Sequence, residues 1–163
     1  MSPAETRVRP TAEHVRSALL DLLAADVPGA RVLDLFAGTG ALGIEALSRG
    51  ADRADFVEFR PSSLHALRAN VAALRLRERT RIFKRDALPF AAALGADSYD
   101  LAFADPPYES RMLDRLIENW RATAFAPVLA VEHARTHVLP PGATRHVFDD
   151  SAITIYRATT APR

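Results

Sequence analysis

Short apolar runs alternate along this chain with longer segments in which apolar side chains recur at the spacing of a helix. A run of about four to eight apolar residues that is bounded by turn-forming residues predicts a buried strand. We interpret seven runs as strands, at residues 32–36, 54–59, 80–84, 99–104, 125–132, 144–148 and 153–157.

Helical spacing fills most of the gaps between these runs. Pro10, Thr11 and Glu13 are typical of a helix start, and an apolar stripe follows them, so a helix is predicted over residues 9–24. The stripe comprises Val15, Ala18, Leu19, Leu22 and Leu23. Further helices are expected over residues 41–49, from Pro61 onward and around residues 113–120.

Strands that alternate with helices predict an α/β fold with a mostly parallel, seven-stranded sheet and helices on both faces. The last two strands are separated only by Asp149, Asp150 and Ser151, so we expect a C-terminal β-hairpin. This hairpin would add an antiparallel strand at or near the end of the sheet. In such sheets a ligand binds beyond the carboxyl ends of the strands.

The length of 163 residues suits a single domain over residues 1–163, with a loose tail at 158–163. No apolar stretch is long enough for a membrane helix, and residues 1–7 lack an apolar signal core, so we expect a cytoplasmic protein. The absence of cysteine excludes disulfides and thiolate sites, and the five histidines show no metal-ligand spacing. We expect a monomer without a metal.

A glycine turn follows the first predicted strand and matches the pattern G-x-G-x-x-G at residues 38–43. Asp34, four residues earlier, would repel a pyrophosphate but attract the ammonium and sulfonium groups of S-adenosylmethionine. Phe36 and Ala37 also lengthen the loop beyond a tight pyrophosphate turn. We therefore favour S-adenosylmethionine over a dinucleotide or a purely structural turn. The residues assigned to this part of the cofactor site are Asp34, Phe36, Ala37, Gly38, Thr39 and Gly40.

Acids at the ends of the next two strands complete the predicted cofactor site. Glu58 is placed to accept hydrogen bonds from both ribose hydroxyls. Phe59 would cover one face of the adenine, and Arg60 would lie at the rim. After the third strand, Asp86 is a candidate acceptor for the adenine amino group, with a backbone amide near Ala87 as a donor.

The segment Asp105-Pro106-Pro107-Tyr108 follows the fourth predicted strand. Asp105 is a candidate acceptor for one N–H of an exocyclic amine, and a carbonyl of Pro106 or Pro107 for the other, which would stabilise positive charge on the nitrogen. The prolines stiffen this corner, and Tyr108 is placed to stack on the target base. Together with the glycine turn, this catalytic corner predicts an amino-methyltransferase that acts on a nucleic-acid base.

These motifs resemble those of the class I S-adenosylmethionine-dependent methyltransferases that modify exocyclic amines. The opening segment at residues 9–19, Arg-Pro-Thr-Ala-Glu-His-Val-Arg-Ser-Ala-Leu, is more specific. It is similar to the arginine-proline-threonine helix of the bacterial 16S rRNA guanine-N2 methyltransferases, the guanine-966 family. The resemblance implies a Rossmann-like fold and methylation of N2 of a guanine in the small ribosomal subunit. It also implies that Thr11 closes over the methionine end of the cofactor.

The resemblance leaves two matters open. The motifs do not separate guanine N2 from adenine N6 in RNA or DNA, nor an enzyme from a non-catalytic ribosome-assembly factor. Members of the family usually begin with a basic, glycine-containing arm, whereas only eight residues precede Arg9 here. Without such an arm, contacts to RNA are expected elsewhere. The basic run over residues 75–81, with Lys84 and Arg85, is one candidate, and a solvated connection is the alternative.

Overall fold

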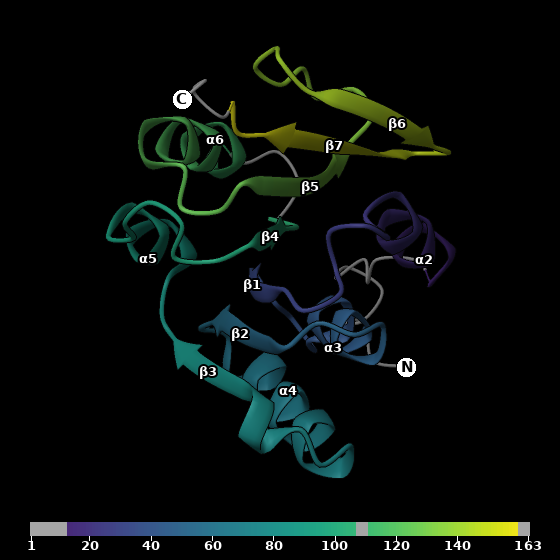
Figure 1. Cartoon of the computed structure of the whole chain (residues 1–163), viewed down its shortest axis with the longest axis vertical. Helices are drawn as coiled ribbons and strands as arrows, with labels where there is room; N and C mark the ends of the chain where they lie inside the picture. Colours follow the sequence, from purple (N-terminus) through teal and green to yellow (C-terminus); the bar gives the residue numbers. More distant parts are fainter. Residues whose placement is uncertain (1–12, 107–110, 160–163) are drawn as a thin grey trace.

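A computed structural model describes residues 13–106 and 111–159 of the chain. Seven strands form one sheet in the order β3-β2-β1-β4-β5-β7-β6 (Figure 1). The strands are β1 (Arg31–Leu35), β2 (Arg53–Glu58), β3 (Thr80–Lys84), β4 (Leu101–Ala104), β5 (Val128–Ala134), β6 (Thr144–Phe148) and β7 (Ser151–Arg157). The first five are mutually parallel, and β7 is antiparallel to both β5 and β6. The predicted fold class is confirmed.

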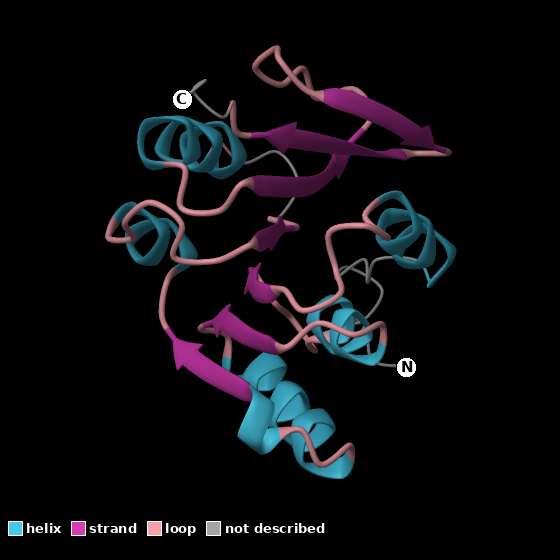
Figure 2. Ribbon diagram, in the orientation of Figure 1, coloured by secondary structure: helices cyan, strands magenta, loops and turns pink. Residues whose placement is uncertain are grey.

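Helices cover both faces of the sheet (Figure 2). Buried side chains of α2 (Glu13–Leu22), α3 (Ala41–Ser48) and α4 (Pro61–Ala73) pack on one face. Those of α5 (Ala87–Ala92) and α6 (Met112–Thr123) pack on the other. A single turn of 3-10 helix, η1 (Arg77–Arg79), leads into β3.

The helix boundaries show where apolar spacing misled. In α2 the predicted Val15 and Leu19 are buried, but so is Leu20, which the predicted stripe omits, whereas the predicted Leu22 is 38% exposed. The prediction missed α5, because its six residues are too few to show a helical period and include Pro89. The expected helix start at residues 9–12 lies outside the described residues.

Two strands begin later than the apolar runs predict. The run at 99–104 starts with Tyr99 and Asp100, whose side chains bond to Asp55 and Arg31 before β4 begins at Leu101. Phe125 and Ala126 are buried ahead of β5, where the Ala126 carbonyl accepts the indole N–H of Trp120 at 2.7 Å. Apolar residues therefore indicated burial correctly but not strand pairing.

The predicted hairpin is present, with β7 between β5 and β6 rather than at the edge of the sheet. The turn at Asp149 has φ +47°. Within residues 13–106 and 111–159, no helix is long and apolar enough to cross a membrane.

Candidate cofactor and methyl-transfer site

The predicted site residues that the structure describes gather at one edge of the sheet. In the parallel register, Leu35 at the end of β1 pairs with Val57 of β2 and with Ala104 of β4, and Glu58 pairs with Lys84 of β3. The glycine turn, Glu58, Asp86 and Asp105 therefore follow four neighbouring strand ends.

The glycine turn depends on left-handed backbone at three positions. Phe36, Gly38 and Gly40 have φ values of +56°, +59° and +84°. A Cβ on Gly40 would lie 2.3 Å from Leu67 Cδ1 of α4, so this position excludes any side chain. A Cβ on Gly38 would meet nothing within 4 Å. The turn thus packs tightly against α4 at Gly40 and leaves open space at Gly38.

Glu58 holds this turn from the end of β2. Its side chain is only 3% exposed, and Oε1 accepts the Gly38 N–H at 2.9 Å. Oε2 accepts the backbone N–H groups of Phe59 and Arg60, each at 2.9 Å, and lies 3.6 Å from the Arg60 guanidinium. A carboxylate accepts about four hydrogen bonds, so Glu58 retains capacity for a ligand hydroxyl.

Asp34 lies inside β1 and is 4% exposed. One oxygen accepts the backbone N–H of Gly43 in the first turn of α3 at 3.1 Å. Burial raises the pKa of Asp34 well above its ordinary value, and the charges of Asp105 and Glu58 raise it further, while the Gly43 hydrogen bond lowers it. Three carboxyl groups thus share one electrostatic neighbourhood, which favours a cationic ligand.

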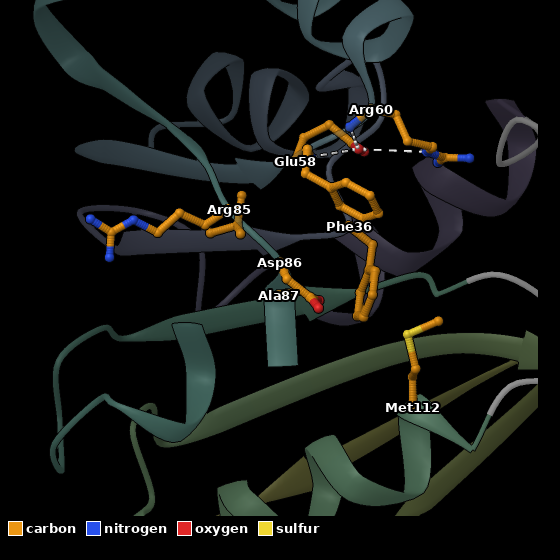
Figure 3. A pocket seen from close by; sticks show the side chains of 9 residues that line it. Phe36, Glu58, Arg60, Arg85, Asp86, Ala87 and Met112 are labelled. Carbon is orange, nitrogen blue, oxygen red and sulfur yellow. Dashed lines mark hydrogen bonds and ion pairs between the residues drawn. The ribbon is translucent and has the colours of Figure 1, made fainter. Parts of the chain in front are cut away.

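A cavity of about 200 Å³ opens beside these acids (Figure 3). It is lined by Phe36, Val57, Glu58, Phe59, Arg60, Arg85, Asp86, Ala87 and Met112. Six of these were predicted for the cofactor: Phe36, Glu58, Phe59, Arg60, Asp86 and Ala87. The other predicted residues, Asp34, Ala37, Gly38, Thr39 and Gly40, are not part of the lining.

Phe59 is 53% exposed where it borders the cavity. A flat apolar surface at this position suits a purine ring, because covering it removes apolar area from water. Phe36 and Met112 also line the cavity, and Figure 3 shows their side chains near each other. The cavity therefore has apolar walls and an acidic end at Glu58, as the adenine and ribose of a nucleoside require.

Asp86 has a local role that the sequence did not reveal. It is the N-cap of α5, and Oδ1 accepts the Leu88 N–H at 3.4 Å. The carboxylate is exposed and borders the cavity, with the buried Ala87 beside it. Asp86 thus starts α5 and also presents a hydrogen-bond acceptor to the cavity.

Asp105 and Pro106 directly follow β4, with Asp105 half-buried and Pro106 buried. Through β4, which pairs with β1, they lie next to the start of the glycine turn. Pro107, Tyr108 and Thr11 lie outside the described residues.

Sequence reasoning missed Met112 and Asn70 as site residues, and it named Arg85 only as a candidate for RNA contacts. Met112 begins α6 and lines the cavity, as does Arg85. Asn70 of α4 donates from Nδ2 to the Thr39 carbonyl at 3.0 Å and so fixes the glycine turn from outside. An exposed asparagine on a helix, such as Asn70, has no sequence pattern that indicates a role in a site. Met112 and Arg85 could be assigned to the cavity only once the order of the strands was known.

The geometry suits a positively charged nucleoside: the cavity has apolar walls and the buried acid Glu58, and the carboxyl groups of Asp34 and Asp105 lie nearby. Fold, site and the relatives described below together define a class I S-adenosylmethionine-dependent methyltransferase. The chain belongs to the family described as "Conserved hypothetical protein 95", whose model matches residues 1–146.

Two relatives have named activities. The chain is 33% identical to "Putative rRNA methyltransferase YlbH" of Bacillus subtilis over 142 residues, which is 84% of this chain and 77% of that protein. It is 36% identical to "Ribosomal RNA small subunit methyltransferase D" of Escherichia coli over 115 residues, or 71% of this chain. The second match spans only 57% of the length of the Escherichia coli protein.

Solved structures agree with the fold. "Putative methyltransferase yhhF" from Escherichia coli superposes with a TM-score of 0.78 at 30% identity, over 91% of this chain and 86% of that one. An RNA methyltransferase from Salinibacter ruber in complex with S-adenosyl-L-homocysteine has a TM-score of 0.72 at 16% identity, over 91% of this chain and 93% of that one. At that identity the second likeness concerns the fold alone.

Proposed function

We propose that this protein transfers a methyl group from S-adenosylmethionine to the exocyclic N2 amine of a guanine in 16S rRNA. The observation that carries the proposal is the place of Asp105. It follows β4 at the edge where the cofactor cavity opens, and its charge is close enough to act on Asp34. The names of the two relatives, both rRNA methyltransferases, support rRNA as the substrate.

The main contribution of the protein to this reaction is to align the amine nitrogen with the methyl carbon. S-adenosylmethionine supplies an electrophilic methyl group on a sulfonium, and the amine lone pair forms the N–C bond while the C–S electron pair stays on sulfur. A purine amine is a weak nucleophile because its lone pair is delocalised into the ring. Near-attack positioning supplies roughly 7–11 kcal/mol in well-oriented reactions.

In this proposal the catalytic corner holds the amine. Asp105 accepts one N–H and a carbonyl of the Pro106–Pro107 segment accepts the other, which draws the nitrogen toward tetrahedral geometry. Both acceptors stabilise the positive charge that the nitrogen gains. Tyr108 stacks on the base, and the amine passes one proton to water once the bond to carbon has formed. The guanine reaches this corner by leaving its stack.

The cofactor is held on the other side of the same edge. Glu58 accepts from the ribose hydroxyls, Phe59 covers the adenine, and Asp86 accepts from the adenine amino group. The carboxyl groups of Asp34 and Asp105 attract the ammonium and sulfonium end. Arg60 lies at the rim of the cavity, where its ion pair with Glu58 at 3.6 Å orients the acid.

The test is methyl transfer from labelled S-adenosylmethionine to unmodified small ribosomal subunits, free rRNA and DNA, followed by nucleoside mass spectrometry. We expect N2-methylguanosine from subunits or rRNA alone. Label in methyladenine would replace the proposal with an adenine N6 enzyme. Cofactor binding without transfer to any substrate would replace it with a non-catalytic assembly factor.

A further inference from the structure

The basic residues of this chain are concentrated in one short segment. Residues 75–85 hold six of the 21 Lys and Arg residues and one of the 20 Asp and Glu residues. Since the net charge of the chain is +1, the remainder is net negative. The segment forms the last turn after α4, η1, β3 and the start of the β3–α5 connection.

The fold places this segment at an open edge. In the sheet order β3 is the terminal strand, so one side of its backbone has no strand partner (Figure 1). The side chains of Arg75, Arg77, Lys84 and Arg85 are exposed, as is Arg68 on α4. We call these five residues the basic edge.

Two exposed acids, Glu78 and Asp86, lie next to the basic edge in sequence, but most of its cations are not held in ion pairs within the described part of the chain. Among the described residues, Arg68, Arg75, Arg77 and Lys84 form no ion pair within 4.0 Å. By contrast, the neighbouring Arg81 is paired with the buried Asp55 at 2.7 Å. Arg79 donates to the backbone carbonyls of Ala51 and Asp52. Arg79 and Arg81 thus serve the fold, whereas the cations of the basic edge are exposed to solvent.

Two hollows lie beside β3, one on each side, and residues of the basic edge line both of them. On the α4 side, Arg68 and Arg77 border one of about 250 Å³ together with Thr80. On the α5 side, Arg85 borders a groove of about 390 Å³ that the Phe90 ring also lines. Arg85 belongs to the cofactor cavity as well, so the edge continues into the site. Guanidinium groups beside a hollow suit phosphate oxygens, and an aromatic ring suits a base.

We propose that the basic edge binds the sugar-phosphate backbone of the RNA strand next to the target guanine. The inference rests on the proposed function, because it requires RNA as the substrate. Three strand spacings of about 4.8 Å place β3 about 14 Å from β4. A strand that delivers its base to Asp105 therefore reaches Arg85 within a few nucleotides and continues along β3 to Arg77.

Charged side chains on an edge strand also have a simpler role, which is to keep sheet edges of two molecules apart. The two roles make different predictions. Phosphate contacts release counterions, so removing one changes the dependence of RNA affinity on salt, by about one in the slope of log K against log salt. A guard against edge pairing leaves RNA affinity unchanged.

The experiment compares two variants with the same net charge. Arg77→Gln/Lys84→Gln removes two exposed cations of the basic edge. Ala24→Glu/Ala122→Glu adds two negative charges and so lowers the net charge by the same amount. Both positions are exposed and lie away from the cofactor edge, one after α2 and one near the end of α6. Affinity for unmodified 16S rRNA is measured over a range of salt concentrations, with the KM for rRNA in methyl transfer. Affinity for S-adenosylhomocysteine reports an intact cofactor site in both.

We expect the edge variant to bind rRNA about tenfold more weakly than the control variant and to lose about two from the salt slope. Equal affinity and slope in the two variants would overturn the inference, provided that the wild type methylates rRNA. A wild type that neither binds nor methylates rRNA would overturn the proposed function, and this inference with it. Methyl transfer by the wild type therefore separates the two failures.

Discussion

Glu58 accepts the backbone N–H of Gly38 at 2.9 Å, which ties the acid at the end of β2 to the glycine turn after β1. The same carboxylate accepts the N–H groups of Phe59 and Arg60. It thereby fixes two of the loops that border the cofactor cavity, the one after β1 and the one after β2. Its assigned role toward ribose depends on this frame, since a fixed acceptor loses less freedom when a ligand binds.

Replacing Glu58 with glutamine is expected to weaken cofactor binding. The amide keeps one acceptor but turns an NH₂ group toward backbone N–H donors. The loss of a charge-assisted hydrogen bond, about 1.5–3 kcal/mol, corresponds to roughly 10- to 150-fold in the dissociation constant. Calorimetric titration with S-adenosylhomocysteine measures it. Glu118→Gln, on the exposed side of α6, is the matched control, and equal affinity in the two variants would exclude Glu58 from the cofactor site.

Asp105→Ala is expected to abolish methyl transfer while cofactor binding persists. In the proposed function Asp105 holds the amine, so its loss would remove one of two acceptors that stabilise the developing charge, a change of about 100-fold or more in kcat for such sites. Single-turnover methylation and cofactor titration on the same preparation measure both quantities. Loss of cofactor affinity with an intact fold would instead assign Asp105 to the cofactor cavity.

The buried charge of Asp34 is expected to lower the stability of the fold and to strengthen binding of the cationic cofactor. Its folded-state pKa lies above the ordinary value of 3.8, so the ionised carboxylate opposes folding, and the stability it contributes falls as pH rises from 3.8 through the folded-state pKa. Asp34→Asn keeps an acceptor for Gly43 without the charge. The variant is expected to gain stability relative to the wild type as pH rises.

Urea unfolding at pH 5 and pH 8 measures this gain, with the exposed Asp52→Asn as the control for loss of one carboxylate. The same Asp34→Asn variant is expected to bind S-adenosylmethionine about tenfold more weakly, because a negative charge near the cationic end is lost. A stability difference that shrinks toward high pH would contradict the account of Asp34.

Gly43→Ala is expected to destabilise the protein by about 1–3 kcal/mol through overpacking. A Cβ at this position would lie 2.6 Å from Phe56 Cε1 and 3.2 Å from the Asp34 carboxylate. Gly95→Ala is the control, because a Cβ there would meet nothing within 4 Å and its φ is not positive. Thermal unfolding of both variants separates the crowding at Gly43 from the general effect of replacing glycine.

The fold class was predictable from the alternation of apolar runs with helical segments. The place of the site was predictable because the carboxyl ends of parallel strands lie at one edge of the sheet. Once seven apolar runs were assigned, Glu58, Asp86 and Asp105 were each expected at the end of a strand. The register shows that β3, β2, β1 and β4 lie in this order, so the three acids reach the same edge of the sheet. The insertion of β7 between β5 and β6 was not predictable, since apolar runs contain no information on pairing partners.

Parts of the site were hidden for a similar reason. Asn70 bonds to Thr39 across 31 positions of sequence, and Met112 enters the cavity from the far end of a connection. Contacts of this kind depend on packing between elements. The hydrogen bonds to Glu58 and Asp34 also could not be predicted from sequence. A motif indicates where a carboxylate lies, but not which backbone N–H groups donate to it.

The place of β7 has a consequence for synthesis on the ribosome. The strand is made after β6 and inserts between it and β5, pairing with β5 along seven residues and with β6 along five. A nascent chain that ends before residue 151 therefore carries β5 with an unpaired, strongly apolar edge. Such edges recruit other chains. The edge of β5 stays open to them, and β6 cannot join the sheet, until β7 has been made.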